Sequence, residues 1–583
     1  MVSHKISLIC VRKESPLTEI LEKQNNSAKE GLPGGIALVV DEQEKLIGTI
    51  TDGDVRRAFL KNRTLDLSAK DIMRESPIFF DETLSYQEIL EKIPQELLKR
   101  NRKAGKFLGK IILVNKDQKP TRILDYHQLW EQRVATHRHV VVMGLGYVGL
   151  TLALVLADEG FLVTGVDVDE NRVNALNKGE SYVHELGLLQ ILREQLNKNF
   201  RATTSMPEGG DVFIISVGTP VKKGSDGKAV LITDYLEIAS KQIGEHIKPG
   251  NLVILRSTVP IGTSRQLVAP MIEKISGLKA GTDFHLAFAP ERTAEGKAIQ
   301  ELRELPQIIG GINVDSVEAT VALFRELTSA IVRVESLEAA EMAKLINNSF
   351  RDVVFSYANH VAQIAAHFNI DVVSTINAAN QGYPRDKVPL PSPGVGGPCL
   401  TKDPYIFASV AEKLGITTTL FEQGRRINES MHDFVAASLL RELKKINKNP
   451  KDCSVLVCGL AFKGHPETGD IRNSSSVEII DLLKPHVKEI FGYDPVATKE
   501  EIESFGIRAA DIPDGFAGKD AVLFLNNHRS FTKIDIYGMV RSLNTNPIIY
   551  DGWHMFRHQD VLNAAPSVYM GISNIHSSIQ PNT

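Results

Sequence analysis

Short apolar runs recur along the middle of the chain and alternate with longer segments of helical periodicity. Between about residues 138 and 330 the strand-like runs are HVVVMG, FLVTGVD, VFIISVG, NLVILRS, HLAFAP and QIIGG. Apolar runs that alternate with helices are typical of a parallel sheet covered by helices on both faces. The pattern predicts a doubly wound α/β domain here.

The alternation stops and then returns. Residues from about 336 to 380 include SLEAAEMAKLINNSFRDVVFSYANHVAQIAAHF, which lacks glycine and proline and predicts one long helix. From about residue 452 a second alternation begins with SVLVCGLAF, EIFGYD, AVLFLN and PIIYDG, and it predicts a second Rossmann-like domain. The tail after about residue 566 is polar and aperiodic, which is typical of disorder.

The first 134 residues contain two similar units. GIALVVDEQEKLIGTITDGDVRRAFL and KIILVNKDQKPTRILDYHQLW each read as strand, polar turn, strand and a helix that opens on an aspartate. A helical segment, PLTEILEKQ or SYQEILEKI, precedes each unit. A repeat of about sixty residues that cannot bury its own apolar face predicts a paired module.

Composition narrows the class of protein. A chain of 583 residues is too long for one core. Its net charge of −4, without a basic stripe, argues against nucleic-acid binding. Its four cysteines form no disulfide framework and no signal peptide is evident, so we expect a cytoplasmic protein. We predict no metal site.

One stretch has the length of a short membrane span. VVVMGLGYVGLTLALVLA, residues 140–157, holds 18 residues without a charge. Glycines interrupt it, a strand-like run begins it and another strand-like run follows. A strand, a tight turn and a buried helix explain this context, so we expect no membrane span.

The turn in that stretch has the spacing of a dinucleotide site. Gly144 would make the tight turn, Gly146 would let the backbone approach a pyrophosphate, and Gly149 would pack helix on strand. Asp167 ends the next strand, 23 residues after Gly144, where an acid binds the ribose 2′-hydroxyl. An acid there repels a 2′-phosphate, which favours NAD over NADP, although the cationic side chain of Arg172 argues for NADP.

Cys399 lies in GVGGPCLTKDP, among glycine, proline, lysine and aspartate. An isolated cysteine is more often a packed core thiol, but these neighbours are not core residues. The Lys402 ammonium and a helix that starts nearby would lower the thiol pKa. A thiolate beside a nicotinamide suggests addition to an aldehyde, loss of a second hydride, and hydrolysis of the resulting thioester.

At this point a family can be named. From residue 138 to about 555 the chain resembles the NAD-dependent UDP-glucose/UDP-N-acetylhexosamine 6-dehydrogenases. The motifs that carry the resemblance are GLGYVG, SVGTP, RSTVPIGTS, APERTAEG, AAEMAKLINNS, GVGGPCLTKDPY and GLAFKGHPETGDIRNSSS. It implies two NAD-dependent oxidations of a primary alcohol to a carboxylate. It also implies an NAD domain, a long central helix that forms a homodimer or larger homo-oligomer, and a UDP-binding C-terminal domain.

The resemblance implies a catalytic set: Cys399, Lys344, Asn348, Asp403, Glu295 and Thr258. Cys399 would be the nucleophile, and Asp403 with an ordered water would be the base. Lys344 and Asn348, spaced i, i+4, would hold the oxyanion at the 6-position. The alternative for Lys344 is a solvated helix charge, although its neighbours are apolar. Thr258 would hold the catalytic water, and Glu295 would assist thioester hydrolysis.

The resemblance also implies binding residues. The coenzyme would contact Gly144, Gly146, Tyr147, Val148, Gly149, Asp167, Arg172, Thr219 and Lys402. The UDP-sugar would contact Glu291, Arg292, Arg385, Gly396, Lys463 and Arg472. Lys402 and Arg472 suit phosphate oxyanions.

The sugar remains open among three candidates. Arg292, Pro398 and Arg385 look more like the branch that acts on UDP-N-acetylmannosamine or UDP-N-acetylglucosamine than like the UDP-glucose branch. The sequence ANH at 358–360 departs from the asparagine-glutamate pair of many members. The alternatives are a UDP-glucose 6-dehydrogenase and a nucleotide sensor with an inactive dehydrogenase part.

The N-terminal repeat resembles a pair of CBS domains through GTITDGDVRRAF. In that family Thr51 and Asp54 would hold the ribose and phosphate of an adenine nucleotide, and Asp54 would cap a helix. The second unit keeps Asp125 but lacks the glycine and threonine, so at most one nucleotide site is expected. A dimerisation or packing module is the alternative.

Together these features predict an α/β chain. An α+β CBS pair over 1–134 precedes two Rossmann-like doubly wound domains, one for NAD over 138–335 and one for the UDP-sugar over 441–583. A helical domain over 336–440 joins them and carries the cysteine loop.

Overall fold

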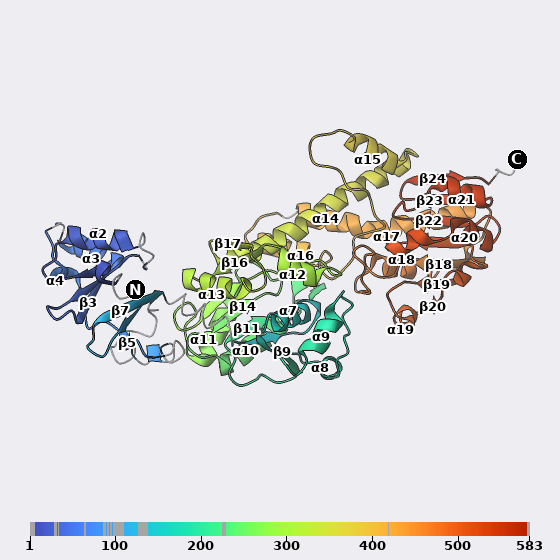
Figure 1. Cartoon of the computed structure of the whole chain (residues 1–583). Coiled ribbons are helices and arrows are strands. Elements are labelled where there is room, and N and C mark those ends of the chain that lie inside the picture. Colours follow the sequence, from blue (N-terminus) through green and yellow to red (C-terminus); the bar gives the residue numbers. More distant parts are fainter. Residues whose placement is uncertain are drawn as a thin grey trace.

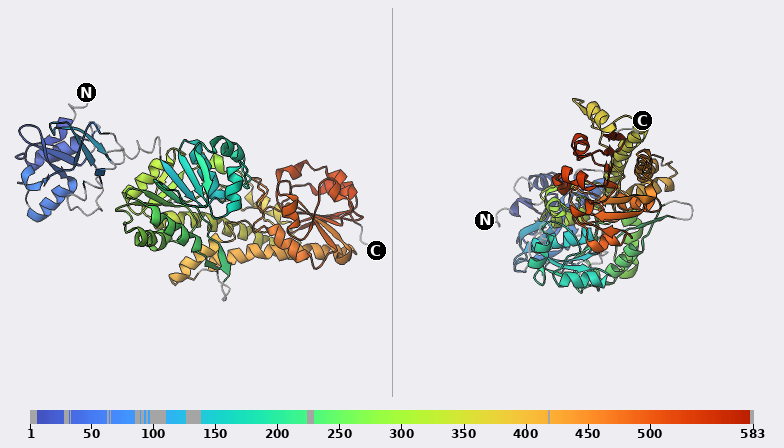
Figure 2. Two further views of the ribbon diagram at one scale, coloured as in Figure 1. Left: turned by 90° about the horizontal axis from the view of Figure 1, so that it is seen from below. Right: turned by 90° about the vertical axis from the view of Figure 1, so that its right-hand side faces the viewer.

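The computed structural model describes residues 6–27, 34–62, 66–84, 110–125, 138–223, 229–417 and 419–579, together with 32, 64, 89, 92, 93 and 96. The N-terminal module lies at one end of an elongated molecule and the C-terminal sheet at the other (Figure 1). The eight-stranded central sheet lies between them, and long helices run from it to the C-terminal sheet (Figure 2). The predicted fold class is confirmed.

The N-terminal module contains two small sheets. The first has the order β1-β2-β3-β4, with strands Cys10–Val11, Ile36–Val40, Leu46–Thr51 and Arg74–Glu75. Helices α2 (Leu17–Ser27) and α3 (Asp52–Asn62) accompany it. The second sheet has the order β5-β6-β7, with strands Phe79–Asp81, Lys110–Val114 and Pro120–Asp125.

The two sheets repeat one pattern. In each, a parallel strand pair leads into an antiparallel hairpin whose register shifts at the end of the first hairpin strand. The turn residues match as well, because Asp41 and Asn115 each accept backbone N–H bonds from the residues two and four positions later. The segment SYQEILEKI lies mostly outside the described residues, and so does the Asp125 side chain.

The central sheet has eight strands in the order β10-β9-β8-β11-β14-β15-β16-β17. Their bounds are Phe200–Thr203, Leu162–Val166, His139–Met143, Val212–Ile215, Leu252–Leu255, His285–Phe288, Gln307–Gly311 and Ile331–Arg333. All neighbouring pairs are parallel except β15 with β16. A small hairpin of β12 (Val221–Lys223) and β13 (Ala229–Leu231) stands apart.

Helices cover both faces of this sheet. Alternate residues of β8 enter different cores: Val140 and Val142 pack with α7 and α13, whereas Val141 and Met143 pack with α10 and α11. The helices are α7 (Tyr147–Asp158), α8 (Glu170–Asn177), α9 (Leu188–Gln195), α10 (Asp234–His246), α11 (Ala269–Ser276), α12 (Ala298–Glu304) and α13 (Val314–Phe324). The uncharged stretch 140–157 is therefore β8, a turn and α7. No helix of the described residues is apolar for long enough to cross a bilayer.

The central helices are α14 (Leu337–His367), α15 (Val372–Asn380), α16 (Asp403–Lys413) and α17 (Thr419–Lys445). The capping side chain of Ser336 accepts from Ala339 N and starts α14 as one continuous helix, as predicted. A fully buried pair, Arg425 on α17 and Asp352 on α14, joins the two long helices at 2.6 Å. Arg425 also donates to the carbonyls of Val395 and Leu400, so it fixes the loop that carries Cys399.

The C-terminal sheet has the order β20-β19-β18-β21-β22-β23-β24 and is parallel except at β24. Its strands are Arg508–Ala509, Glu489–Tyr493, Ser454–Cys458, Ala521–Phe524, Ile548–Asp551, Val568–Gly571 and Asn574–Ser577, and its helices are α18 (Ser475–Leu483), α19 (Lys499–Glu503), α20 (Ile536–Ser542) and α21 (His558–Ala564). The prediction of disorder after residue 566 was wrong for residues 567–579, and residues 580–583 lie outside the described part. The run VYMG is short, but β22 and β24 flank it, and all four of its residues are buried.

Candidate active site

The glycine turn after β8 has the geometry of a phosphate-binding loop. Gly144 has φ +89°, which favours glycine, and a Cβ on Gly149 would meet the Gly144 carbonyl oxygen at 1.8 Å. Space opens in front of Gly146, where a Cβ would meet nothing within 4 Å. Gly146 precedes α7 without a side-chain cap, so the first amides of α7 are available to an anion. The residues present fit the pyrophosphate of NAD.

Asp167 is buried at the end of β9. Its carboxylate accepts the N–H of Leu145 at 2.7 Å and that of Asp169 at 3.0 Å. Each oxygen keeps a lone pair that can accept a ribose hydroxyl. Arg172 lies 3.6 Å from Asp167 and 3.4 Å from Asp169, so two carboxylates balance the cation that argued for NADP.

The remaining predicted coenzyme residues lie near this turn or in adjoining loops. Tyr147 and Val148 form the first turn of α7. The Thr219 hydroxyl donates to the Thr258 carbonyl at 2.7 Å, which joins the SVGTP and RSTVP loops at the ends of β11 and β14. Lys402 lies beside Cys399 in the central part.

Cys399 is exposed to solvent, whereas Cys453 and Cys458 are buried core thiols. Four charged side chains act on its sulfur, those of Asp403, Lys344, Lys402 and Glu295. Crowding by protein and the Asp403 carboxylate raise the pKa of the Cys399 thiol, and the two lysines oppose this. The predicted net lowering of this pKa is therefore wrong for this arrangement, because burial by the surrounding protein, which contributes most, and the Asp403 carboxylate together outweigh the two lysines.

Asp403 is the first residue of α16 and is fully buried. It accepts a hydrogen bond from Asn348 at 2.6 Å and from Lys402 at 2.9 Å. Lys344 and Asn348 both lie on the buried face of α14, each 8% exposed. Within the described part of the chain, Lys344 makes no hydrogen bond and no ion pair. A buried, unpaired ammonium beside the exposed thiol suits an anionic oxygen of a substrate.

Glu295 connects the NAD domain to the C-terminal domain. Lys463 donates to its carbonyl at 2.8 Å, and Thr468 donates to its carboxylate at 3.4 Å. Arg472 lies 3.8 Å from the same carboxylate. Burial and the Asp470 carboxylate raise the pKa of Glu295 to about 7, against the two cations. A carboxyl with this pKa can take up and release a proton near neutral pH.

The loop before Cys399 requires glycine where it meets the C-terminal domain. A Cβ on Gly396 would meet the Asn473 carbonyl oxygen at 2.4 Å. The Gly397 N–H donates to that oxygen at 2.9 Å, and Gly397 has φ +94°. The thiol therefore lies where all three parts of the chain meet.

Three predicted substrate residues do not join this group. The buried Glu291 carboxylate lies 2.7 Å from Arg256. Burial alone would raise the pKa of Glu291, but the Arg256 and Lys344 cations lower it to about 2. Arg292 donates to the Pro306 carbonyl. Arg385 lies over the Tyr383 ring on the surface. Among the described residues no hydrogen bond or ion pair joins any of the three to the Cys399 loop, although Lys344 acts electrostatically on both Glu291 and Cys399.

The predicted nucleotide residues of the N-terminal module are hydrogen bonded to each other. Asp54 accepts from the Thr51 hydroxyl at 2.6 Å, and from Arg57 and Arg74 at 2.6 and 2.5 Å. Burial opposes ionisation, but these donors lower the pKa of Asp54. A pocket of about 490 Å³ lies along β3 and β4, and its lining contains neither Thr51 nor Asp54: Lys13, Leu46, Ile47, Met73, Glu75, Ser76, Pro77 and Phe79.

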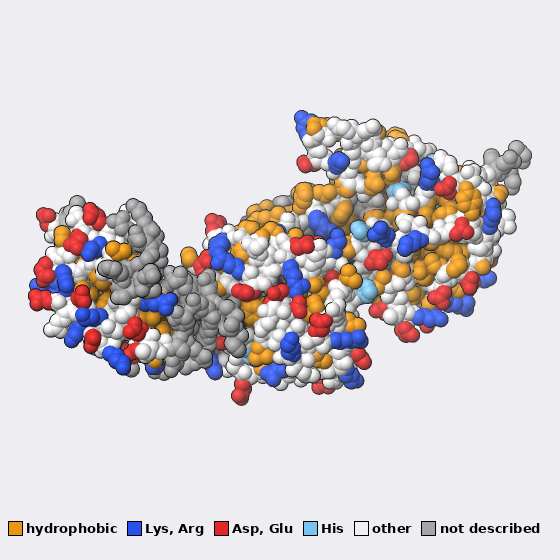
Figure 3. Space-filling view, viewed as in Figure 1, with side chains coloured by type: hydrophobic (Ala, Val, Ile, Leu, Met, Phe, Trp, Pro, Cys, Tyr) orange, Lys and Arg blue, Asp and Glu red, His pale blue; other side chains and the backbone are white. Residues whose placement is uncertain are grey.

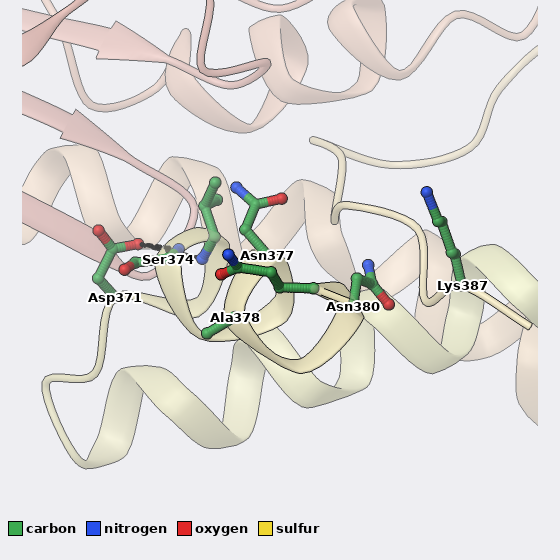
Figure 4. A pocket seen from close by; sticks show the side chains of 8 residues that line it. Asp371, Ser374, Asn377, Ala378, Asn380 and Lys387 are labelled. Atoms are coloured by element: carbon green, nitrogen blue, oxygen red, sulfur yellow. Dashed lines mark hydrogen bonds between the residues drawn. The ribbon is translucent and has the colours of Figure 1, made fainter. Parts of the chain in front are cut away.

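A larger open pocket, of about 800 Å³, lies on α15. Figure 4 shows its lining of Asp371, Ser374, Asn377, Ala378, Asn380 and Lys387. It contains none of the residues singled out from the sequence. Over the described residues, no cluster of three or more His, Cys, Asp or Glu side chains could hold a metal.

Sequence reasoning missed several residues that shape the site. Asp470 and Thr468 lie inside a motif that was recognised, but nothing in their spacing separates them from their neighbours. Arg425 could have been suspected, because an arginine within a helix of mixed pattern must find a partner if buried. Glu185, described further below, lies outside every motif.

Comparison with known sequences identifies the family. Models of the UDP-glucose/GDP-mannose dehydrogenase family match this chain in three parts: the NAD binding domain at 138–328, the central domain at 338–430 and the UDP binding domain at 456–558. The chain belongs to this family. It is an NAD-dependent nucleotide-sugar dehydrogenase, and its N-terminus matches a CBS domain at residues 2–61.

Relatives of the dehydrogenase bear more specific names. It is 34% identical over 428 residues, 72% of this chain and 97% of the relative, to a UDP-N-acetyl-D-mannosamine dehydrogenase of Pyrococcus horikoshii. It is 32% identical over 405 residues, 68% of this chain and 96% of the relative, to an enzyme of the same name from Campylobacter jejuni.

Solved structures that are similar to the chain are also named as nucleotide-sugar dehydrogenases. A UDP-D-ManNAc dehydrogenase from Pyrococcus horikoshii matches with a TM-score of 0.67 and 32% identity, covering 75% of this chain and 99% of that one. A UDP-glucose dehydrogenase from Pyrobaculum islandicum matches with a TM-score of 0.64 and 25% identity, covering 76% of this chain and 98% of that one. The N-terminal module lies outside the part that family models assign to the dehydrogenase.

Proposed function

We propose that the dehydrogenase oxidises the 6-hydroxymethyl group of UDP-N-acetylmannosamine to the uronate, in two oxidations at one site. The observation that carries the proposal is the arrangement around Cys399: an exposed thiol beside a buried unpaired lysine, a buried aspartate and a carboxyl with a pKa of about 7. The sugar is proposed from the names of the relatives.

The chain's own residues divide the work as follows. When bound, NAD⁺ accepts the hydride that carbon 6 loses in each oxidation. Asp403 takes the proton of the 6-hydroxyl through a water, while Lys344 and Asn348 donate to the oxygen as it becomes negative. The sulfur of Cys399 then bonds to carbon 6 of the aldehyde, and its proton moves to the oxygen. Loss of a second hydride and of that proton gives a thioester.

Hydrolysis completes the sequence. The oxygen of a water bonds to carbon 6, the carbon–sulfur bond breaks, and the sulfur leaves as thiolate while Glu295 takes the water's proton. Each uronate therefore consumes two NAD⁺ and one water and releases three protons with two NADH. Because only the ionised Glu295 can accept a proton, this step should speed up as the pH rises through about 7.

The test is turnover of UDP-N-acetylmannosamine, UDP-N-acetylglucosamine and UDP-glucose side by side, with NADH and uronate both quantified. We expect the highest kcat/KM for UDP-N-acetylmannosamine and two NADH per uronate. A preference for UDP-glucose would refute the proposed sugar. A single NADH per product would refute the four-electron sequence, and no turnover of any sugar would favour the inactive-dehydrogenase alternative.

We propose further that the N-terminal module binds an adenine nucleotide at Thr51 and Asp54, in the vicinity of the 490 Å³ pocket. Arg57 and Arg74, which both form ion pairs with Asp54, would supply positive charge to the nucleotide phosphate. Calorimetric titration of the full chain with ATP and AMP, at saturating NAD, tests this. Absence of heat with both nucleotides would leave the module a structural part.

We propose a homodimer through α14. Exposed apolar side chains follow this helix at intervals of four or seven residues, from within α14 to its C-cap: Met342, Ile346, Phe350, Tyr357, Ile364 and Phe368. Figure 3 shows hydrophobic side chains gathered along the middle of the molecule, where Figure 1 places α14. A continuous apolar stripe of this length is typical of an interface. Analytical ultracentrifugation should show that the wild-type protein is a dimer and that the double variant Phe350→Glu, Tyr357→Glu is a monomer. A monomeric wild type would refute the proposal.

A further inference from the structure

A buried carboxylate in the NAD domain links the coenzyme turn to the loop that carries Glu295. Glu185 lies between α8 and α9 and is 8% exposed. Its carboxylate accepts the Tyr147 hydroxyl, the Gly296 N–H at 2.7 Å and the Ala298 N–H at 2.9 Å. The Gly296 N–H also lies 3.0 Å from the Tyr147 hydroxyl oxygen. We call these four residues the Glu185 clamp.

Each partner of Glu185 has a place in the proposed chemistry. Tyr147 follows Gly146 directly and opens α7, whose amides face the pyrophosphate site. Gly296 follows Glu295, and Ala298 begins α12, which packs on α7. The Glu185 clamp therefore bonds the backbone immediately after Glu295. It also joins that backbone to Tyr147, at the start of the helix whose amides face the pyrophosphate site.

The Glu295 loop has little freedom on its other side. Gly296 has φ +87°, and a Cβ there would meet the Glu467 carbonyl oxygen at 2.6 Å. Lys463 holds the Glu295 carbonyl. The loop is thus held between Glu185 of the NAD domain and residues 463–468 of the C-terminal domain, and a change at Glu185 would move the Glu295 carboxylate relative to Cys399.

We infer that Glu185 is a positioning residue for thioester hydrolysis: it holds Glu295 beside Cys399 and, through Tyr147, makes that position depend on the occupied coenzyme turn. A carboxylate suits this role because it only accepts hydrogen bonds and here meets three donors. Glutamine has the same shape, but its NH₂ group would face an N–H or O–H donor and lose part of the clamp. The inference rests on the function proposed above.

The first experiment separates hydride transfer from hydrolysis. Wild type, Glu185→Gln and Glu318→Gln are mixed rapidly with NAD and the best UDP-sugar. Glu318 is the control because its carboxylate pairs with Arg333 at the surface, away from the site. For Glu185→Gln we expect the fast NADH phase to stay within about twofold of wild type and steady-state uronate formation to fall by at least about tenfold, within the range of general-base effects. Mass spectrometry of quenched enzyme should show an acyl group on Cys399, and the pH midpoint of hydrolysis should move away from about 7.

The second experiment needs no turnover. Hydrogen exchange of the segment 292–300 is measured with and without NAD alone. We expect NAD to slow hydrogen exchange of this segment in wild type and in Glu318→Gln. NAD should not slow it in Glu185→Gln, or in Tyr147→Phe, which lacks the hydroxyl that donates to Glu185. Equal NAD protection in all four proteins would overturn the link to the coenzyme turn.

The outcomes keep the two proposals apart. If wild type forms no uronate from any sugar, the proposed function fails, and hydrogen exchange still decides whether the clamp exists. If uronate forms with two NADH but Glu185→Gln hydrolyses the thioester at the wild-type rate, the positioning role is refuted. Equal loss of the fast and slow phases, with a lowered melting temperature, would also refute it, because it would show a structural role only.

Discussion

Replacing Cys399 with serine is expected to lower uronate formation by at least about 10³-fold, on the scale seen when a covalent nucleophile is removed from other enzymes. The serine hydroxyl is far less acidic than a thiol, so it cannot add to the aldehyde as an anion beside Asp403. The first oxidation needs Lys344, Asn348 and Asp403 but not the sulfur. Cys399→Ser should therefore release at most one NADH per sugar consumed, against two in wild type.

The measurement is NADH and uronate from one reaction, with calorimetric titration of NAD to show that the coenzyme site is intact. Cys453→Ser is the matched control, because Cys453 is a buried thiol near the start of β18, away from Cys399. Its turnover should match wild type. Uronate formation by Cys399→Ser at the wild-type rate would remove the covalent sequence altogether.

Much of the fold could be predicted because apolar periodicity is strong in buried parallel strands. The strands β8, β11, β14, β15, β18, β21 and β22 are fully buried, so each corresponds to a short apolar run in the sequence. The partly exposed strands β10 and β20 were not predicted. The strand β23 was missed because VYMG has only four residues and follows a proline and a serine. The feature that decides its state, pairing with β22, is not local in sequence.

The candidate site was predictable where chemistry is carried by a motif. The structure brings Cys399, Lys344, Asn348 and Asp403 together, and it places Glu295, Lys463 and Arg472 in one network. The sign of the change in the Cys399 pKa was not predictable. It depends first on how far the fold buries the thiol and then on the distances of the opposed charges, and neither can be read from residue identities. Glu185 was missed because its role comes from backbone amides more than a hundred positions away.

The proposed catalytic residues Glu295, Lys344 and Asp403 come from different domains of the chain. The NAD domain contributes Glu295, the central helices contribute Lys344 and Asp403, and residues 463–472 of the C-terminal part hold Glu295 from the other side. Domain movement would therefore change the distance from Glu295 to Cys399. This is a physical reason for Glu185, on the NAD-domain side, to be buried and to accept three hydrogen bonds.

Replacing Asp403 with asparagine is expected to change two rates in opposite directions. Turnover should fall by about 10²- to 10⁴-fold, because the residue proposed as base can no longer take a proton. The reactivity of Cys399 towards iodoacetamide should rise severalfold, because the Asp403 charge raises the pKa of this thiol and its removal increases the thiolate fraction. The variant imitates the enzyme after the first oxidation, when Asp403 has been neutralised and the thiolate is required.

Alkylation is followed by mass spectrometry at pH 7 to 8, with Cys399→Ser giving the background from the other cysteines. Asp481→Asn is the control, since the exposed Asp481 carboxylate pairs with Lys484 and, within the part of the chain that the structure describes, with no other cation; both of its rates should match wild type. Asparagine can still accept a hydrogen bond from Asn348 or Lys402, so α16 should keep its start and the melting temperature should change little. Slower alkylation in Asp403→Asn would show that the carboxylate favours the thiolate, and the proposed order, neutralisation of Asp403 before attack by Cys399, would then be wrong.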